Sequence, residues 1–288
     1  MRVVRTPSEL PRGRRAVAIG TFDGVHRGHR AVLDAARAAG PIATVVTFDP
    51  HPRTALGNRV ELLTTLERRL ELLGEAGLDE ALVVGFDLEL ARLEPEAFAE
   101  RYLRAIGAEV VVAGAGFRFG HRRSGDLELL ARLGFDVRPV AIVEGTSSSA
   151  IRSLLQAGEI GRAARALGRP PELDGIVVSG DARGGTLGFP TANLRLEPEL
   201  LVPAFGIYAG SALGHRAALS IGVNPHYGGE ELRVEAFLLD FEGDLYGQRV
   251  VVELWERLRD ERAFGSEEEL VEQIARDVER ARRAERPA

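Results

Sequence analysis

Residues 16–48 read AVAIGTFDGVHRGHRAVLDAARAAGPIATVVTF, and this stretch decides the fold class of the first half of the chain. Its two ends, residues 16–20 and 42–48, are almost entirely apolar, which is typical of strands buried on both faces. Between them, apolar residues recur at the spacing of one helix face, at Val32, Leu33, Ala36 and Ala39. Because Gly40 and Pro41 then stop the helix, the stretch predicts a strand, a helix and a second, parallel strand.

The same alternation continues through the first half of the chain. Helices are expected from a capping box at Thr64 and Glu67, from Pro95, and over residues 125–133. Further apolar strands are expected at residues 81–86, 109–114 and 136–143. Buried parallel strands separated by helices predict an α/β fold, with an open, doubly wound, Rossmann-like sheet.

Two short helices, expected over residues 148–156 and 159–167, close this half. Arg169, Pro170 and Pro171 then break the helical pattern. We therefore place two domains, at residues 1–168 and 172–288.

The second half is predicted to be an antiparallel β-barrel domain with a C-terminal helix. Short apolar strands alternate with glycine-rich turns from residue 173 onward, and residues 242–244 have the composition of a hairpin turn. The last helix is expected from Ser266 to about Arg283, because it has a serine cap, an acidic start and a basic end.

The amino-acid composition excludes several kinds of catalytic and binding site. The 288 residues contain no cysteine, and all 37 basic side chains are arginines. Thiolate zinc sites, cysteine nucleophiles, lysine Schiff bases and a phosphate loop ending in GK[ST] are therefore excluded. A formal net charge of −6 gives no general attraction to nucleic acid or to an anionic membrane. No apolar run has the length of a membrane span, and no signal peptide is apparent, so we expect a cytoplasmic protein.

The first candidate site lies in GTFDGVHRGHR, residues 20–30. His26 and His29 are three residues apart at a helix N-terminus, so both rings share one face beside free backbone amides, where an anion is favoured. Gly24 and Gly28 would let a phosphate approach the backbone. Two alternatives are a simple capped helix with exposed histidines and a metal site that includes Asp23.

HRGH after a strand resembles the HxGH signature of nucleotidyltransferases, and other segments resemble one family in particular. These are TFDPHP (47–52), LLTTLERRLELL (62–73), GFRFG (116–120) with Gly125 and Asp126, and SSSAIR (147–152). Together they are similar to the adenylyltransferase half of bifunctional riboflavin kinase/FAD synthetases, and the resemblance extends in order along essentially the whole chain.

The resemblance implies that His26 and His29 stabilise charge on the ATP phosphates while FMN attacks the α-phosphorus. It places ATP contacts at Gly20, Thr21, Phe22, Asp23, Gly28, Ser147, Ser148 and Arg152, and flavin contacts at Phe117 and Asp126. Taken alone, the serine-rich segment is equally well explained as a capped helix with a surface arginine.

The second candidate site lies in GDARGGTLGFPTAN, residues 180–193. Glycines let backbone amides approach an anion, and Thr191 and Asn193 offer neutral oxygens two positions apart for a magnesium ion. GFPTAN resembles the riboflavin kinase signature, in which the Thr and Asn bind magnesium and phosphate. By that resemblance, ATP would contact Gly180, Arg183, Gly184, Gly185, Gly188, Pro190 and Tyr246.

Glu235 interrupts an apolar row in the strand LRVEAFLLDF, residues 232–241. An isolated buried carboxylate is costly, so Glu235 is a candidate general base for a riboflavin hydroxyl, and it matches the catalytic glutamate of the kinase family. The structural alternative is an ion pair with Arg233 or Arg249. Arg259 and Phe264 also resemble flavin-binding positions of the kinases, although Phe264 could instead attach the last helix to the barrel.

Some positions depart from the family pattern. Gly116 stands where Asp or Asn is usual, Ser149 replaces a Thr, and Ala150 replaces an Arg. Lost polar contacts could weaken flavin or ATP binding by about 1–3 kcal/mol each. No departure falls at Thr191, Asn193 or Glu235.

These observations predict a two-domain enzyme that uses ATP and Mg²⁺ to convert riboflavin to FMN and FMN to FAD. The alternatives are a chain in which only the kinase is active and a non-catalytic flavin-binding regulator. The expected partners are small molecules, namely riboflavin, FMN and ATP, and the sequence does not define an oligomeric state.

Overall fold

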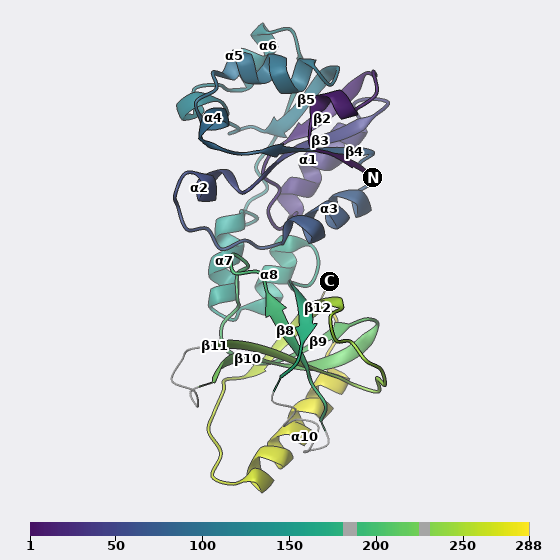
Figure 1. Cartoon of the computed structure of the whole chain (residues 1–288), viewed down its shortest axis with the longest axis vertical. Coiled ribbons are helices and arrows are strands. Elements are labelled where there is room, and N and C mark those ends of the chain that lie inside the picture. The colour runs from purple at the N-terminus through teal and green to yellow at the C-terminus, as the bar shows by residue number, and fades with distance from the viewer. Residues whose placement is uncertain (181–188, 225–230, 288) are drawn as a thin grey trace. The chain divides into compact units, whose positions relative to one another are not determined.

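The computed structural model describes residues 1–180, 189–224 and 231–287. The chain forms two compact units, the first made of Met1–Leu62 and Leu66–Ser147, and the second of Leu63–Thr65 and Ser148–Ala288. Figure 1 labels their elements along the chain.

The first unit contains a six-stranded sheet in the order β1-β4-β3-β2-β5-β6, in which every neighbouring pair is parallel. Its strands are β1 (Arg2–Val4), β2 (Arg15–Ile19), β3 (Ala43–Asp49), β4 (Glu80–Gly85), β5 (Ala108–Gly114) and β6 (Asp136–Val140). The predicted doubly wound α/β fold is confirmed. Because the order reverses beside β2, the carboxyl end of β2 opens at the position where such sheets bind ligands.

Helices cover both faces of this sheet (Figure 1). On one face, α1 (Arg27–Arg37) and α3 (Leu66–Glu75) pack against small apolar side chains of the strands, including Ala16, Ala18 and Val45. The other face carries α4 (Leu88–Ala91), α5 (Pro95–Phe98), a π-helical turn (Ala99–Arg104) and α6 (Leu127–Arg132). The remaining short elements are α2 (Pro52–Ala55) and the 3₁₀ turns Pro7–Glu9 and His121–Arg123.

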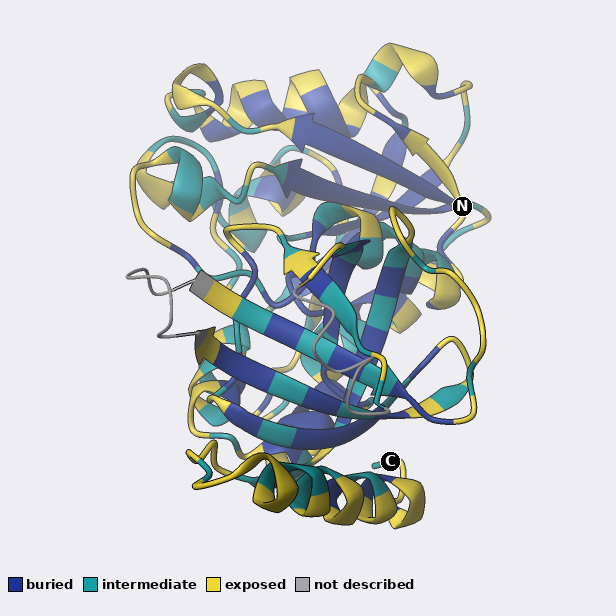
Figure 2. Ribbon diagram, turned by 60° about the horizontal axis from the view of Figure 1, so that its bottom comes forward, coloured by how far each residue is buried: buried dark blue, intermediate teal, exposed yellow. Residues whose placement is uncertain are grey.

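The second unit contains a closed, wholly antiparallel barrel in the order β10-β11-β8-β7-β12-β9. Its strands are β7 (Glu172–Val178), β8 (Ala192–Leu196), β9 (Gly206–Ala212), β10 (His215–Asn224), β11 (Glu231–Leu238) and β12 (Arg249–Arg259). Barrel strands alternate between buried and more exposed residues in Figure 2, whereas the central strands of the parallel sheet are buried almost throughout. This difference follows from a barrel with one filled interior and a sheet covered on both faces.

The final helix, α10 (Glu267–Arg283), packs on the outside of the barrel. Ser266 accepts a hydrogen bond from the Glu269 N–H, so the predicted serine cap is present. Ala281 and Ala284 are buried against Ala209 and Leu258, beside Trp255. Small side chains on both elements allow this close approach.

Helices α7 (Ser148–Gln156) and α8 (Ile160–Leu167) share the core of the barrel. Ile151, Leu155 and Leu167 are buried with Leu173 and Tyr208 in one cluster. The compact units divide the chain at 147/148, because the apolar faces of both helices pack against barrel side chains. The domain bounds 1–168 and 172–288 stay a prediction.

One turn prediction is wrong. Residues 242–244 do not close a hairpin, because β11 and β12 are not neighbours: β8 and β7 lie between them in the barrel. Strands β1 and β8 are additional to those expected, and both are short and contain few consecutive apolar residues.

Candidate active sites

The turn after β2 holds the first group of candidate residues in a constrained backbone. Phe22 and Val25 have φ angles of 51° and 37°, in the left-handed region that non-glycine residues rarely occupy. The Thr21 carbonyl anchors the turn, accepting hydrogen bonds from Thr47 Oγ1 at 3.1 Å and from Arg69 Nη1 at 2.9 Å. The turn is thereby fixed at the carboxyl end of the sheet.

The two histidines form a stacked pair at the start of α1. Their ring centroids are 3.6 Å apart with an interplanar angle of 17°, and Phe22 meets the His29 ring edge-on. His26 caps the helix, with its Nδ1 accepting the backbone N–H of His29 at 3.2 Å. A neutral His26 therefore carries its proton on Nε2.

Burial keeps His29 uncharged. Desolvation, with smaller contributions from His26 and Arg69, lowers the pKa of His29 well below its ordinary value. The His29 Nδ1 atom is buried without a hydrogen-bond partner in the described part of the chain. His29 is therefore held as a neutral imidazole, stacked on His26, at the start of α1.

Gly28 is required by close packing in this site. A Cβ at residue 28 would lie 2.9 Å from Thr146 Oγ1 and 3.2 Å from the His26 ring. Asp23 is almost fully buried, and Gly20, directly after β2, donates its N–H to the Val46 carbonyl. Among the described residues, no group of three His, Asp or Glu side chains is arranged to hold a metal ion, so the alternative metal site with Asp23 is not supported.

The other residues expected at this site have local roles. Asp126 Oδ1 caps α6 through the Leu129 N–H, while its Oδ2 lies 3.0 Å from Arg118 Nη1. Phe117 stacks on Phe119 at 5.7 Å. A Cβ at Gly116 would meet no atom within 4 Å, so the glycine at this position is not required by close packing.

Ser147 ends the first unit, whereas Ser148 and Arg152 belong to α7 in the second. Ser149 and Ala150 occupy the first turn of the same helix, and Arg152 is half-buried. The expected grouping of this segment with the histidines remains a prediction.

In the second unit, strand register brings Glu235 and Asn193 together. They are direct partners across β11 and β8, and Glu235 is also the partner of Ser220 across β10. Their neighbours Ala236, Val234 and Leu219 fill the barrel interior, so Glu235, Asn193 and Ser220 share its outer face. Directly opposed side chains have Cβ atoms about 5 Å apart.

Gly180 packs directly against Asn193. A Cβ at residue 180 would lie 2.3 Å from Asn193 Nδ2 and 2.7 Å from its Oδ1, so only glycine fits. Thr191 immediately precedes β8, half-buried, and Pro190 is exposed beside it. Arg183, Gly184, Gly185 and Gly188 lie outside the described residues.

The segment containing Tyr246 lies beside the end of β7. The Gly247 N–H donates to the Val177 carbonyl at 2.9 Å, and Val177 lies three residues before Gly180. Tyr246 itself is 63% exposed. The position of this aromatic ring is compatible with contact to a ligand held by the Gly180 segment.

Arg259 and Phe264 meet at the start of the connection to α10. The Arg259 guanidinium lies 5.8 Å from the Phe264 ring and bonds Asp277 of α10 through Nε and Nη2, at 2.9 and 2.7 Å. Arg259 is thus held by a buried carboxylate on the helix. Phe264 is half-buried and lies in the segment that joins β12 to α10. This position agrees both with a flavin contact and with attachment of the last helix to the barrel.

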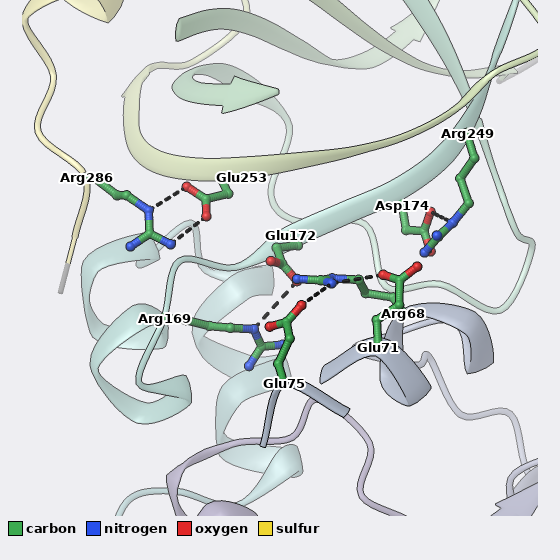
Figure 3. Close-up of polar contacts among 9 residues, drawn as sticks. All are labelled: Arg68, Glu71, Glu75, Arg169, Glu172, Asp174, Arg249, Glu253 and Arg286. Carbon is green, nitrogen blue, oxygen red and sulfur yellow. Dashed lines mark hydrogen bonds and ion pairs between the residues drawn. The ribbon is translucent and has the colours of Figure 1, made fainter. Parts of the chain in front are cut away.

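Arg249, which the sequence offers as an ion-pair partner of Glu235, forms an ion pair with Asp174. Its Nε and Nη2 atoms bond the two oxygens of Asp174, each at 2.8 Å (Figure 3). Thr65 Oγ1 donates to the same carboxylate at 2.5 Å. Figure 3 also shows separate pairs in the second unit, Arg169 with Glu172 and Arg286 with Glu253.

Residues that sequence reasoning did not select also line these positions. Arg69 and Thr47 anchor the first turn, and Ser220 faces Glu235. The Glu261 carboxylate lies against Gly222 of β10, two residues from Ser220, and burial raises its pKa. Strand register alone reveals Ser220; the others are brought close only by the folded chain.

Family models divide the chain in the same order as these two sites. An FAD synthetase model matches residues 10–152, and a riboflavin kinase model matches residues 167–285. The chain belongs to the bifunctional riboflavin kinase/FMN adenylyltransferase family. Both family signatures and their order therefore agree with the resemblance of the motifs.

Curated relatives support the assignment along nearly the whole chain. The bifunctional riboflavin kinase/FMN adenylyltransferase of Listeria monocytogenes is 35% identical over 93% of this chain and 91% of its own. The Escherichia coli (strain K12) protein of the same name is 36% identical over 98% of this chain and 96% of its own.

A solved structure is similar along nearly the whole chain. A Streptococcus pneumoniae protein described as a macrolide-efflux protein covers 97% of this chain and 98% of its own, with 31% identity and a TM-score of 0.86. That description concerns the Streptococcus protein. In the described part of the present chain, no helix has the length and apolar character needed to span a bilayer.

Proposed function

We propose that the chain makes FMN from riboflavin in its second unit and FAD from FMN in its first, with ATP as co-substrate of both steps. The observation that carries this proposal is that the FAD synthetase model covers most of the first unit and the riboflavin kinase model lies within the second, and each unit holds its own candidate site. The acidic overall charge fits small-molecule substrates bound at local sites.

In the adenylylation step, the FMN phosphate oxygen attacks the α-phosphorus of ATP and pyrophosphate leaves. The amides at the start of α1 favour the triphosphate there. The His26 ring and the neutral His29 ring can donate N–H groups to phosphate oxygens as charge develops on the leaving group, and their stacking holds both in position. This catalysis is positional and electrostatic, and the histidines exchange no proton with substrate.

In the kinase step, the riboflavin ribityl hydroxyl loses its proton to Glu235 while its oxygen attacks the γ-phosphorus of ATP, and ADP leaves. Glu235 fits this role because it lies beside Asn193 on the outer barrel face, where GFPTAN would hold the phosphates. Tyr246 and the Gly180 segment would contact ATP, and Arg259 and Phe264 would contact the flavin.

The residues fit a magnesium ion bound with the kinase phosphates. Mg²⁺ prefers oxygen ligands and usually takes only one or two from protein, with substrate phosphates and water completing its shell. Thr191 Oγ1 and Asn193 Oδ1 would hold it, since both are neutral oxygens two positions apart in an extended segment at the start of β8. The ion would neutralise charge on the transferred phosphate.

The test is to incubate the purified chain with riboflavin, ATP and Mg²⁺ and to quantify FMN and FAD separately. Accumulation of both products supports the proposal. FMN without FAD, even when FMN is supplied, would instead support a kinase with an inactive first unit, and no ATP-dependent turnover of riboflavin would support a flavin-binding regulator.

A further inference from the structure

Arg69 is a buried cation at the carboxyl ends of two central strands. Its side chain extends from the first turn of α3 and is only 3% exposed. Nη1 donates to the Thr21 carbonyl after β2 at 2.9 Å, and Nη2 donates to the Phe48 carbonyl in β3 at 3.2 Å. One guanidinium therefore joins the two strand ends that border the histidine pair.

The bonds of Arg69 differ from those of the other deeply buried arginine in this unit. Arg15 lies at the opposite end of β2 and is neutralised by a carboxylate, with its Nε 2.6 Å from Glu80. Arg69 hydrogen-bonds only to carbonyl groups among the described residues, and its buried Nε has no partner there. A buried charge held without a direct carboxylate is costly, so its retention at this position calls for an explanation.

The turn that Arg69 holds is the one that presents the histidines. Phe22 and Val25 adopt left-handed backbone, which costs about 1 kcal/mol or more for each non-glycine residue. Thr47 Oγ1 binds the same Thr21 carbonyl, so two donors on different elements fix the first residue of the turn. If this carbonyl moved, the cap made by His26 would move with it.

The charged groups around Arg69 also belong to the site. Asp23 of the turn and Asp49 of β3 raise the pKa of Arg69, although burial lowers it more strongly, and Arg69 in turn contributes to the lowered pKa of His29. The guanidinium thus provides a fixed positive charge close to the histidine pair.

We propose that Arg69 is a positioning residue for adenylyl transfer, which holds the Thr21–Val25 turn so that the His26–His29 pair is aligned with the reacting phosphate. The proposal rests on the assigned adenylyltransferase function of the first unit. A slight shift of the turn need not change substrate binding. It would change the alignment of the histidine pair with the phosphate in the transition state, and small displacements of this kind can lower rates by about 100-fold.

The variants Arg69→Gln, Arg69→Lys and Thr47→Val separate charge from anchoring. Gln removes the charge and cannot join both carbonyls. Lys keeps the charge with a single ammonium, and Val removes only the second donor to the Thr21 carbonyl. Arg37→Gln, on the exposed side of α1, is the control for loss of one arginine from this unit. The kinase activity of each preparation reports whether the rest of the chain remains intact.

We expect Arg69→Gln to lower kcat for FMN adenylylation about 100-fold while both KM values change less than about 3-fold. Arg69→Lys should be intermediate, and Thr47→Val should lower kcat less. The Arg69→Lys and Thr47→Val effects should be non-additive because both act on one carbonyl. The kinase rate of each variant and both rates of Arg37→Gln should remain unchanged.

Unchanged kcat in Arg69→Gln, a loss confined to KM, or an equal loss in Arg37→Gln would overturn the proposal. If Arg69→Gln fails to fold, the Arg69→Lys and Thr47→Val pair decides, and additive effects would overturn it. Absence of FAD formation by the parent chain would contradict the assigned function instead, so the two failures are distinguishable.

Discussion

At the scale of single residues, the contact between Gly180 and Asn193 gives a direct test of the kinase site. Because a Cβ at residue 180 would lie 2.3 Å from the Asn193 amide, Gly180→Ala must displace that amide from its place beside Glu235. We expect the kinase kcat to fall at least about 10-fold, with FAD formation from FMN unchanged. Steady-state rates of both reactions measure this.

Gly161→Ala is the matched control, because a Cβ there meets only the Arg165 side chain, at 3.7 Å. A kinase rate in Gly180→Ala equal to that of the control would contradict the placement of Asn193 at the reacting phosphates.

The lowered pKa of the buried His29 ring predicts how the stability of the first unit depends on pH. Its pKa is lowered in the folded state, so the unfolded chain binds more protons as the pH falls through the ordinary value of 6.5. Stability from neutral His29 is therefore fully present above pH 6.5 and is lost below it, by at most about 1.4 kcal/mol per pH unit.

Hydrogen exchange of the β2 amides between pH 7 and 5 measures this loss, and His29→Gln should reduce the slope. An identical slope in parent and variant would show that His29 is not buried in its neutral form.

At the scale of elements, the attachment of α10 depends on a buried ion pair. Asp277 is 4% exposed and bonds Arg259 at the end of β12. Asp277→Ala leaves that guanidinium without its carboxylate, and we expect it to destabilise the second unit by about 3 kcal/mol. Trp255, the single tryptophan, lies beside the contact between α10 and the barrel, so its fluorescence during denaturation reports the loss.

Glu279→Ala is the control for this measurement, since it breaks the exposed Arg283–Glu279 pair on the same helix. Its effect should remain below about 0.5 kcal/mol. Equal effects of the two substitutions would mean that Asp277 does not attach the helix.

Sequence patterns predicted those elements that carry a complete local signal. The apolar runs of β2 to β5 and the capped α10 are examples, because a short run of consecutive residues is enough to indicate a strand buried on both faces or a helix cap. The hairpin at 242–244 was wrong because turn composition does not determine which strands become neighbours in a barrel.

The candidate sites were predictable only in part for the same reason. His26, His29, Thr191, Asn193 and Glu235 stand in motifs, so the sequence indicates them. Arg69 stands within residues 62–73, but that motif does not single it out, and Ser220 stands in none of the motifs. Their places depend on contacts across 48 positions, from Arg69 to Thr21, and on the register of β10 with β11.

At the scale of the whole molecule, we propose that each reaction takes place in its own unit. His29 belongs to the first unit and Glu235 to the second, and each lies on its own framework of parallel or antiparallel strands. Two reactions that share a chain but no catalytic residue should be separable by single substitutions.

The most direct measurement is the rate of each reaction in Glu235→Gln and in His29→Ala, assayed separately with riboflavin and with FMN. Glu235→Gln should abolish FMN formation, with a loss of at least about 100-fold, and leave FAD formation from FMN intact. His29→Ala should stop FAD formation and leave the kinase rate unchanged. Loss of both reactions in either folded variant would contradict two independent sites.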